Sequence, residues 1–138
     1  MATKTVNFTQ TEGPTSSFTD PKFTASNNLP SDINDQDFLI LKVPFGIGSR
    51  IFIQLQMDGF NNNKSFVSLF ASIKSNPTLP ADFVELAGGI LTIPSGTNAI
   101  AYNIANSEYD QVAVKLNKHA STNAGNLTSI LARISNGI

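Results

Sequence analysis

The fold is decided by residues 38–58, which read FLILKVPFGIGSRIFIQLQMD. Apolar residues occupy every second position in both halves of this stretch: Leu39, Leu41, Val43 and Phe45, then Ile51, Ile53, Leu55 and Met57. A period of two places each set on one face of a β-strand. The turn-forming residues Pro44, Gly46 and Gly48 separate the halves. We therefore predict two successive strands.

Strong turn residues follow the second strand. Asp58-Gly59 and then Asn61, Asn62 and Asn63 precede the apolar run at residues 65–70. Turn chemistry between two such runs predicts a β-hairpin with a widened loop. The side-chain oxygens of Asp58, Asn61, Asn62 and Asn63 also make this loop a candidate site for a partner or a cation. It lacks the spaced ligands ending in Glu that define a calcium loop, so no metal ligand set is predicted.

Five further strand-like runs lie downstream, at residues 83–86, 90–93, 99–104, 111–116 and 127–134. Val112, Val114 and Leu116 are set against the polar residues Gln111, Lys115 and Asn117, as in an antiparallel sheet that has one wet face. Only residues 71–76 suggest a helical turn. About eight short strands predict an all-β fold, an antiparallel β-sandwich of jelly-roll type over residues 37–138.

Residues 1–36 have a different composition, dominated by Thr, Ser, Asn, Asp and Pro. They predict an extended polar N-terminal arm, because such a segment buries little apolar surface of its own. Two interpretations stay open. The arm wraps its own domain, with Val6 and Phe8 in a first strand, or it docks on a neighbouring subunit. In the second case the partner-binding residues are the isolated apolar ones, Val6, Phe8, Phe18 and Phe23.

Composition excludes several classes of partner. The net charge is −1 and only 14% of residues are charged, without a basic stripe that could neutralise phosphates, so we expect no nucleic acid. No apolar run approaches the roughly 18 residues that a membrane helix needs, so we expect no membrane partner. The first residues do not resemble a secretory signal, which favours synthesis in the cytoplasm. The absence of Cys excludes disulfides and thiolate metal sites.

Catalytic patterns are missing, and we predict neither an enzyme nor a cofactor. His119 is the single histidine and lies where a strand leads into a polar turn, so it is interpreted as a solvated loop residue. Asp32, Asp35 and Asp37 cluster beside turn-forming residues, which favours local side-chain-to-backbone hydrogen bonds over acid–base chemistry. The paired glycines lack the Lys-Ser/Thr signature of a phosphate-binding loop.

Four segments carry a resemblance to a known group of proteins: QLQMDG at 54–59, SFVSL at 65–69, YDQVAVKL at 109–116 and GNLTSIL at 125–131. With the polar leader, they resemble the small β-sandwich domains of bacteriophage virion proteins. The resemblance implies an auxiliary, decoration or head-fibre protein at the capsid surface. Its partners would be capsid protein or symmetry-related copies of itself, with a homotrimer suited to a capsid axis.

A carbohydrate-binding module for host or glycan attachment is the alternative. The sandwich class and the Asn-rich loop at residues 61–63 favour it. The lack of Trp and the presence of only two Tyr weigh against a sugar-stacking platform, because most Phe residues fall inside strand patterns.

Overall fold

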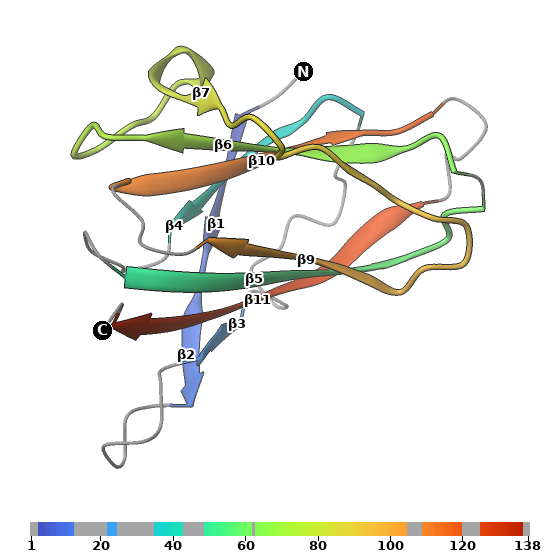
Figure 1. The fold of residues 1–138 in the computed structure, drawn as a ribbon, viewed down its shortest axis with the longest axis horizontal. Helices are drawn as coiled ribbons and strands as arrows, with labels where there is room; N and C mark the ends of the chain where they lie inside the picture. The colour runs from blue at the N-terminus through green and yellow to red at the C-terminus, as the bar shows by residue number, and fades with distance from the viewer. Residues whose placement is uncertain are drawn as a thin grey trace.

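The computed structural model of the chain describes residues 3–12, 22–24, 35–42, 49–61, 63–104, 109–119 and 125–136. The described strands form two β-sheets that pack face to face (Figure 1). The predicted all-β sandwich is therefore confirmed.

The first sheet, sheet A, has six strands in the order β1-β4-β10-β6-β7, with β8 also paired to β6. Its strands are β1 (Thr3–Asn7), β4 (Phe38–Lys42), β6 (Phe66–Ser72), β7 (Val84–Glu85), β8 (Leu91–Thr92) and β10 (Gln111–Asn117). β1 runs parallel to β4, and the other pairs are antiparallel. Sheet A is thus a mixed sheet with one parallel edge.

The second sheet, sheet B, has five strands in the order β2-β3-β11-β5-β9, all antiparallel. Its strands are β2 (Thr9–Glu12), β3 (Lys22–Thr24), β5 (Ser49–Asp58), β9 (Ala99–Ile104) and β11 (Asn126–Asn136). β5 and β11 pair along their whole length, from Asn126↔Asp58 to Asn136↔Ser49, with one irregularity between Leu127 and Ser129. This pair is the longest ladder in the structure.

The predicted hairpin between residues 51–57 and 65–70 is wrong. β5 belongs to sheet B and β6 to sheet A, so the chain crosses between the layers at this loop. Alternation assigns each side chain to a face but does not choose the neighbouring strand. The helical turn expected at residues 71–76 is also wrong, because β6 continues to Ser72. The helical turn in the described chain is a 3-10 helix at Pro80–Asp82.

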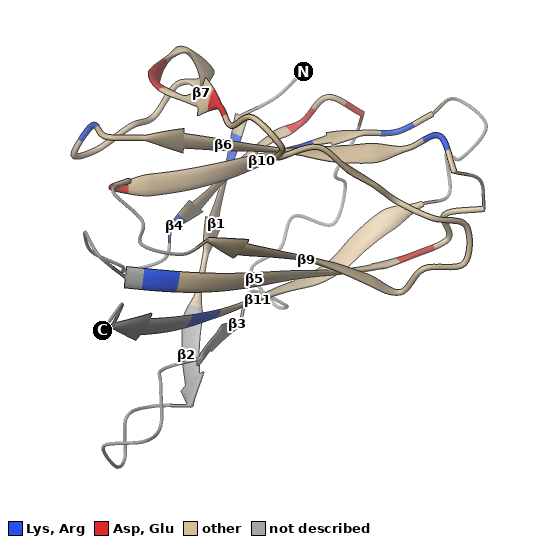
Figure 2. Cartoon of the chain, in the orientation of Figure 1, with Lys and Arg blue, Asp and Glu red and all other residues tan. Residues whose placement is uncertain are grey.

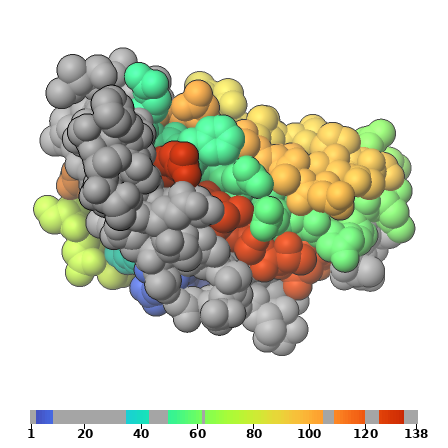
Figure 3. All heavy atoms as spheres, turned by 90° about the horizontal axis from the view of Figure 1, so that it is seen from below, coloured from blue at the N-terminus to red at the C-terminus, as the bar shows by residue number. Residues whose placement is uncertain are grey.

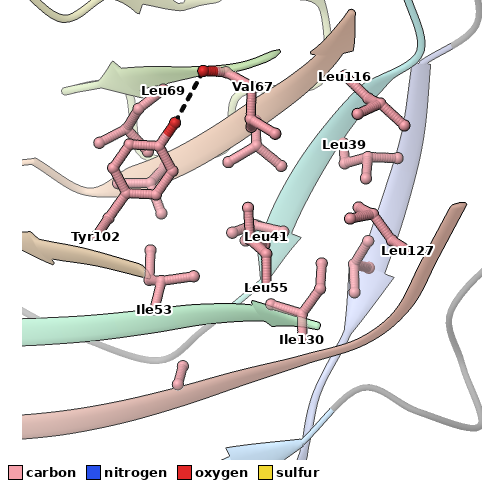
Figure 4. Packing of buried hydrophobic residues seen from close by; sticks show 14 of the residues in the cluster. Leu39, Leu41, Ile53, Leu55, Val67, Leu69, Tyr102, Leu116, Leu127 and Ile130 are labelled. Carbon is pink, nitrogen blue, oxygen red and sulfur yellow. Dashed lines mark hydrogen bonds between the residues drawn. The ribbon is translucent and has the colours of Figure 1, made fainter. Parts of the chain in front are cut away.

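The main core lies between the sheets. Leu39 and Leu41 of β4 face Ile53 and Leu55 of β5, and all four are fully buried (Figure 4). Burial of such a layer is the principal force that holds two sheets together. Tyr102 of β9 adds a polar link across the layers. Its hydroxyl lies 2.7 Å from the Gly89 carbonyl oxygen and 3.1 Å from that of Val67, and burial raises its pKa above the ordinary value.

A second, smaller core covers the opposite face of sheet A. Phe38, Ile40 and Ala113 point away from the main core, yet all are buried together with Phe83. The Phe38 ring meets the rings of Phe70 and Phe83 edge-on, with centroids 5.0 and 5.3 Å apart. β4 is therefore buried on both faces, where the alternation had predicted one. The unbroken apolar run at residues 38–41 is the signal for such a strand.

The N-terminal segment is part of the sandwich wherever it is described. β1 forms an edge of sheet A, and β2 and β3 extend sheet B. Val6 is fully buried in the main core, and half-buried Phe8 packs against it. Residues 3–12 and 22–24 are therefore not an arm outside the domain, and Val6 is not exposed to a partner. Phe23 lies in β3 opposite Ala132, and Phe18 lies outside the described residues.

Val6→Ala is expected to lower the free energy of unfolding by about 1–3 kcal/mol, because it removes two methyl groups from a fully buried site. Thr5→Ala is the matched control, since Thr5 is the exposed neighbour in the same strand. Urea denaturation followed by circular dichroism measures both. Equal stabilities of the two variants would show that β1 does not close the core.

Candidate docking surfaces

The loop between β5 and β6, which contains the residues expected to bind a partner or cation, carries local hydrogen bonds. The Asp58 carboxylate accepts from the Gly59 N–H at 2.8 Å, and Gly59 has a φ of 82°, which suits glycine. The Asn63 side-chain oxygen accepts from the Ser95 N–H at 2.8 Å. Asn61 is exposed, and Asn62 lies outside the described residues. In the described part of this loop, Asp58 and Asn63 thus accept hydrogen bonds from two different backbone N–H groups and stabilise turns.

Phe60, which sequence reasoning overlooked, anchors this loop. Its ring is buried in the main core, and its carbonyl oxygen accepts from the Gly96 N–H at 2.9 Å. Gly125 lies so close that a Cβ there would be 2.8 Å from the Phe60 ring. Nothing in the local sequence marks a loop phenylalanine as buried, because its partners come from distant segments. The buried Phe60 ring therefore holds this loop against the sandwich.

The other polar candidates have structural roles as well. Asp37 is buried and forms an ion pair with Lys4 of β1, with 2.6 Å between Nζ and Oδ2. The Asp35 carboxylate accepts from the Lys118 N–H at 2.8 Å, a bond to a residue distant in the sequence and not the local turn contact that was expected. Asp32 lies outside the described residues. Among the residues that the structure describes, no group of three or more His, Asp or Glu side chains could hold a metal ion.

His119 is exposed, as expected of a loop residue. Its backbone N–H donates to the hydroxyl of buried Ser65 at 3.0 Å, which ties the end of β10 to the start of β6. This contact fixes the backbone and leaves the imidazole on the surface.

Large exposed apolar side chains gather in one part of the chain, residues 73–90. This segment follows β6 and supplies β7 at the end of sheet A. We call these four residues the edge patch, and they are 76, 60, 71 and 57% exposed: Ile73, Leu79, Val84 and Ile90. Because exposed apolar surface is where soluble proteins commonly bind partners, this segment is a candidate docking region. Sequence analysis missed this patch, because apolar residues in strand-like runs were assigned to the core.

Asp82 holds the segment that carries Ile73 and Leu79. Its Oδ1 lies 2.8 Å from Lys74 Nζ, and its Oδ2 accepts from the N–H groups of Thr78 and Leu79 at 3.1 and 3.2 Å. The hydrogen bond from Lys74, followed by those from the two N–H groups, lowers the pKa of Asp82 from 3.8 to about 2. The carboxylate therefore organises the loop before the 3-10 helix.

A groove of about 540 Å³ lies on the outer face of sheet B. β5 contributes Phe52, Gln54 and Gln56, and β11 contributes Leu131 and Arg133. Phe52 is 42% exposed, and the Gln56 side-chain oxygen accepts from the Ser129 hydroxyl, which leaves the Gln56 amide NH₂ as a donor. Figure 3 shows this face, with β5 in green, β9 in gold and β11 in red. We call this feature the sheet B groove.

Comparison with protein-family models and with curated protein sequences gave no match to this chain. Within the described residues, no helix has both the length and the apolar character that crossing a bilayer requires.

Asp82→Asn is expected to destabilise the protein at neutral pH, because the amide cannot replace the carboxylate between Lys74 and the two N–H groups. A carboxyl whose folded pKa is lowered stabilises the fold above its unfolded pKa, here about 4, and loses this effect as the pH falls through about 2. The difference in Tm between wild type and variant should therefore be constant above pH 5 and shrink between pH 4 and pH 2. A difference that is the same at pH 2 and pH 6 would contradict the assignment.

Proposed function

We propose that this chain is a virion structural protein, an auxiliary or decoration protein that binds a bacteriophage capsid through the surface of its sandwich. The observation that carries the proposal is the edge patch. A resemblance to the β-sandwich domains of phage virion proteins suggests that the partner is a capsid. It is carried by residues 54–59, 65–69, 109–116 and 125–131.

The edge patch supports protein binding on energetic grounds. Its four side chains leave apolar surface in water, at a cost of roughly 25 cal/mol for each Å² that a partner could cover. The 14% charged fraction gives the surface few groups whose desolvation would oppose docking. Among the described residues the polar candidates make structural contacts instead of forming a catalytic arrangement. A binding role therefore fits better than a catalytic one.

In this proposal the described N-terminal residues are part of the folded domain and are not the anchor that binds the capsid. Because Val6 is in the core and β1 completes sheet A, the described part of the segment stabilises the domain that docks. Removing this segment would unfold the sandwich, so a deletion could not distinguish a loss of capsid binding from a loss of folding. The contact with the capsid is therefore assigned to the edge patch.

The combined substitution Ile73→Ser and Leu79→Ser tests the proposal. Both residues lie outside strands, so the ladders stay intact, and we expect at least a tenfold lower copy number in purified particles. Asn76→Ser, at an exposed polar site in the same segment, is the control and should leave the copy number unchanged. Quantitative mass spectrometry of particles measures incorporation, and circular dichroism confirms folding. Wild-type incorporation of a folded double variant would contradict docking through the edge patch.

Carbohydrate binding is the second candidate, and the sheet B groove favours it. An exposed aromatic ring beside amide and guanidinium groups offers both an apolar face and hydrogen-bonding partners to a sugar. Phe52→Ala should abolish binding on a glycan array, whereas Ile90→Ala, at a distant exposed site, should not. The absence of binding by the wild type, with and without calcium, would refute this candidate.

A further inference from the structure

β9 is the last strand of sheet B. It pairs with β5 on one side, from Ile51↔Ile104 to Gln56↔Ala99, and no described strand lies on its other side. Figure 1 shows β9 between β5 and the layer of β6 and β10. The outer backbone edge of β9 is therefore available for hydrogen bonding to a further strand.

The register identifies the backbone groups on this edge. The Met57 N–H donates to the Asn98 carbonyl oxygen at 2.9 Å, so residue 98 directs its backbone towards β5. In an antiparallel ladder this orientation alternates, so Ile100 and Tyr102 also bond to β5. Ala99, Ala101 and Asn103 then direct their N–H and C=O groups away from β5. Their side chains are exposed and small, so access to these groups is open.

The other described edges carry features that oppose pairing. β7 and β8 have two residues each, β1 contains Lys4, and β2 contains Glu12 and a register shift. Short strands, charges and bulges are the common means by which sheet edges avoid association. β9 has six residues, no charge, no Pro and no shift in its register (Figure 2). It is thus the described edge best suited to accept a strand.

Apolar surface accompanies this edge. Ile100 and Ile104 pack against the main core but are only half-buried. Ile90, which is 57% exposed, follows Gly89, and the Gly89 carbonyl oxygen lies 2.7 Å from the hydroxyl of Tyr102 in β9. A strand added to β9 would cover Ile100 and Ile104. Backbone pairing and apolar burial would then act together.

We propose that β9 pairs antiparallel with β9 of a second copy of this chain, about a two-fold axis at Ala101. Ala101 then faces Ala101 of the second copy, Ala99 faces Asn103, and Ile100 faces Tyr102. In this register the side chains that face the core in the two copies lie on the same face of the joined sheet. About six backbone hydrogen bonds form between the two strands. The two five-stranded sheets join into one continuous sheet.

A second copy fits this edge better than a foreign strand for two reasons. The strand is uncharged, so two copies meet without repulsion, and its axis places a small Ala against itself. The inference is independent of the proposed role in a virion. It gives a dimer as the elementary unit, in place of the homotrimer that the resemblance suggested.

Ala101→Pro is the test. Proline removes an N–H that points to the free edge and keeps the ladder to β5, because edge positions of this kind tolerate it. Analytical ultracentrifugation should show a concentration-dependent dimer for the wild type and a monomer for Ala101→Pro. Ala101→Lys should also be monomeric, since two cations would meet at the axis. Gln54→Lys is the matched control, because Gln54 lies in β5 directly opposite Ala101 and gains the same charge. This variant should dimerise like the wild type.

Amide hydrogen exchange gives an independent readout. Protection of Ala99, Ala101 and Asn103 should rise by at least tenfold with protein concentration, while Ile100 and Tyr102 should be protected at every concentration. A wild type that stays monomeric at several hundred micromolar would overturn the proposal. A trimer, or a dimer that survives Ala101→Pro, would overturn it equally.

Discussion

The long ladder between β5 and β11 is the interaction on which the rest of the fold depends. Because β5 pairs with β11 on one side and with β9 on the other, neither of its edges is available to β6, and the chain passes between the layers at residues 59–65. The same ladder lines the main core with Ile51, Ile53 and Ile130. Phe60 closes the crossing by filling the space beside Gly125, where β11 begins. The crossing and the main core both follow from the two strands with which β5 pairs.

Much of the fold was predictable because alternation is a local property. Strands were expected at 51–57, 65–70, 99–104, 111–116 and 127–134, and the structure has strands at all five places. Pairing was not predictable in the same way. Two strands that each have one apolar face satisfy the pattern whether they share a sheet or face each other across the core. The hairpin error at Asp58-Gly59 came from this ambiguity.

The candidate surfaces were harder to foresee than the strands. Val6 is one apolar residue among polar ones, and only the parallel pairing of β1 with β4 places it in the core. Conversely, Val84 and Ile90 have the composition of core residues but lie where sheet A ends. Exposure is a property of position in the assembled sheet, and the residues that determine it are distant in sequence. The sheet B groove likewise combines side chains from β5 and β11.

The strand at the centre of each sheet comes later in the chain than the strands on either side of it. β10 joins β4 to β6 in the middle of sheet A, and β11 joins β3 to β5 in the middle of sheet B. Both central strands come from the last part of the chain, residues 111–136. Without these residues each layer is divided into separate pieces, β1-β4 and β6 with β7 and β8 in sheet A, and β2-β3 and β5-β9 in sheet B. Both sheets can therefore be completed only once residues 111–136 are present, and the apolar strands made earlier lack their central partners until then.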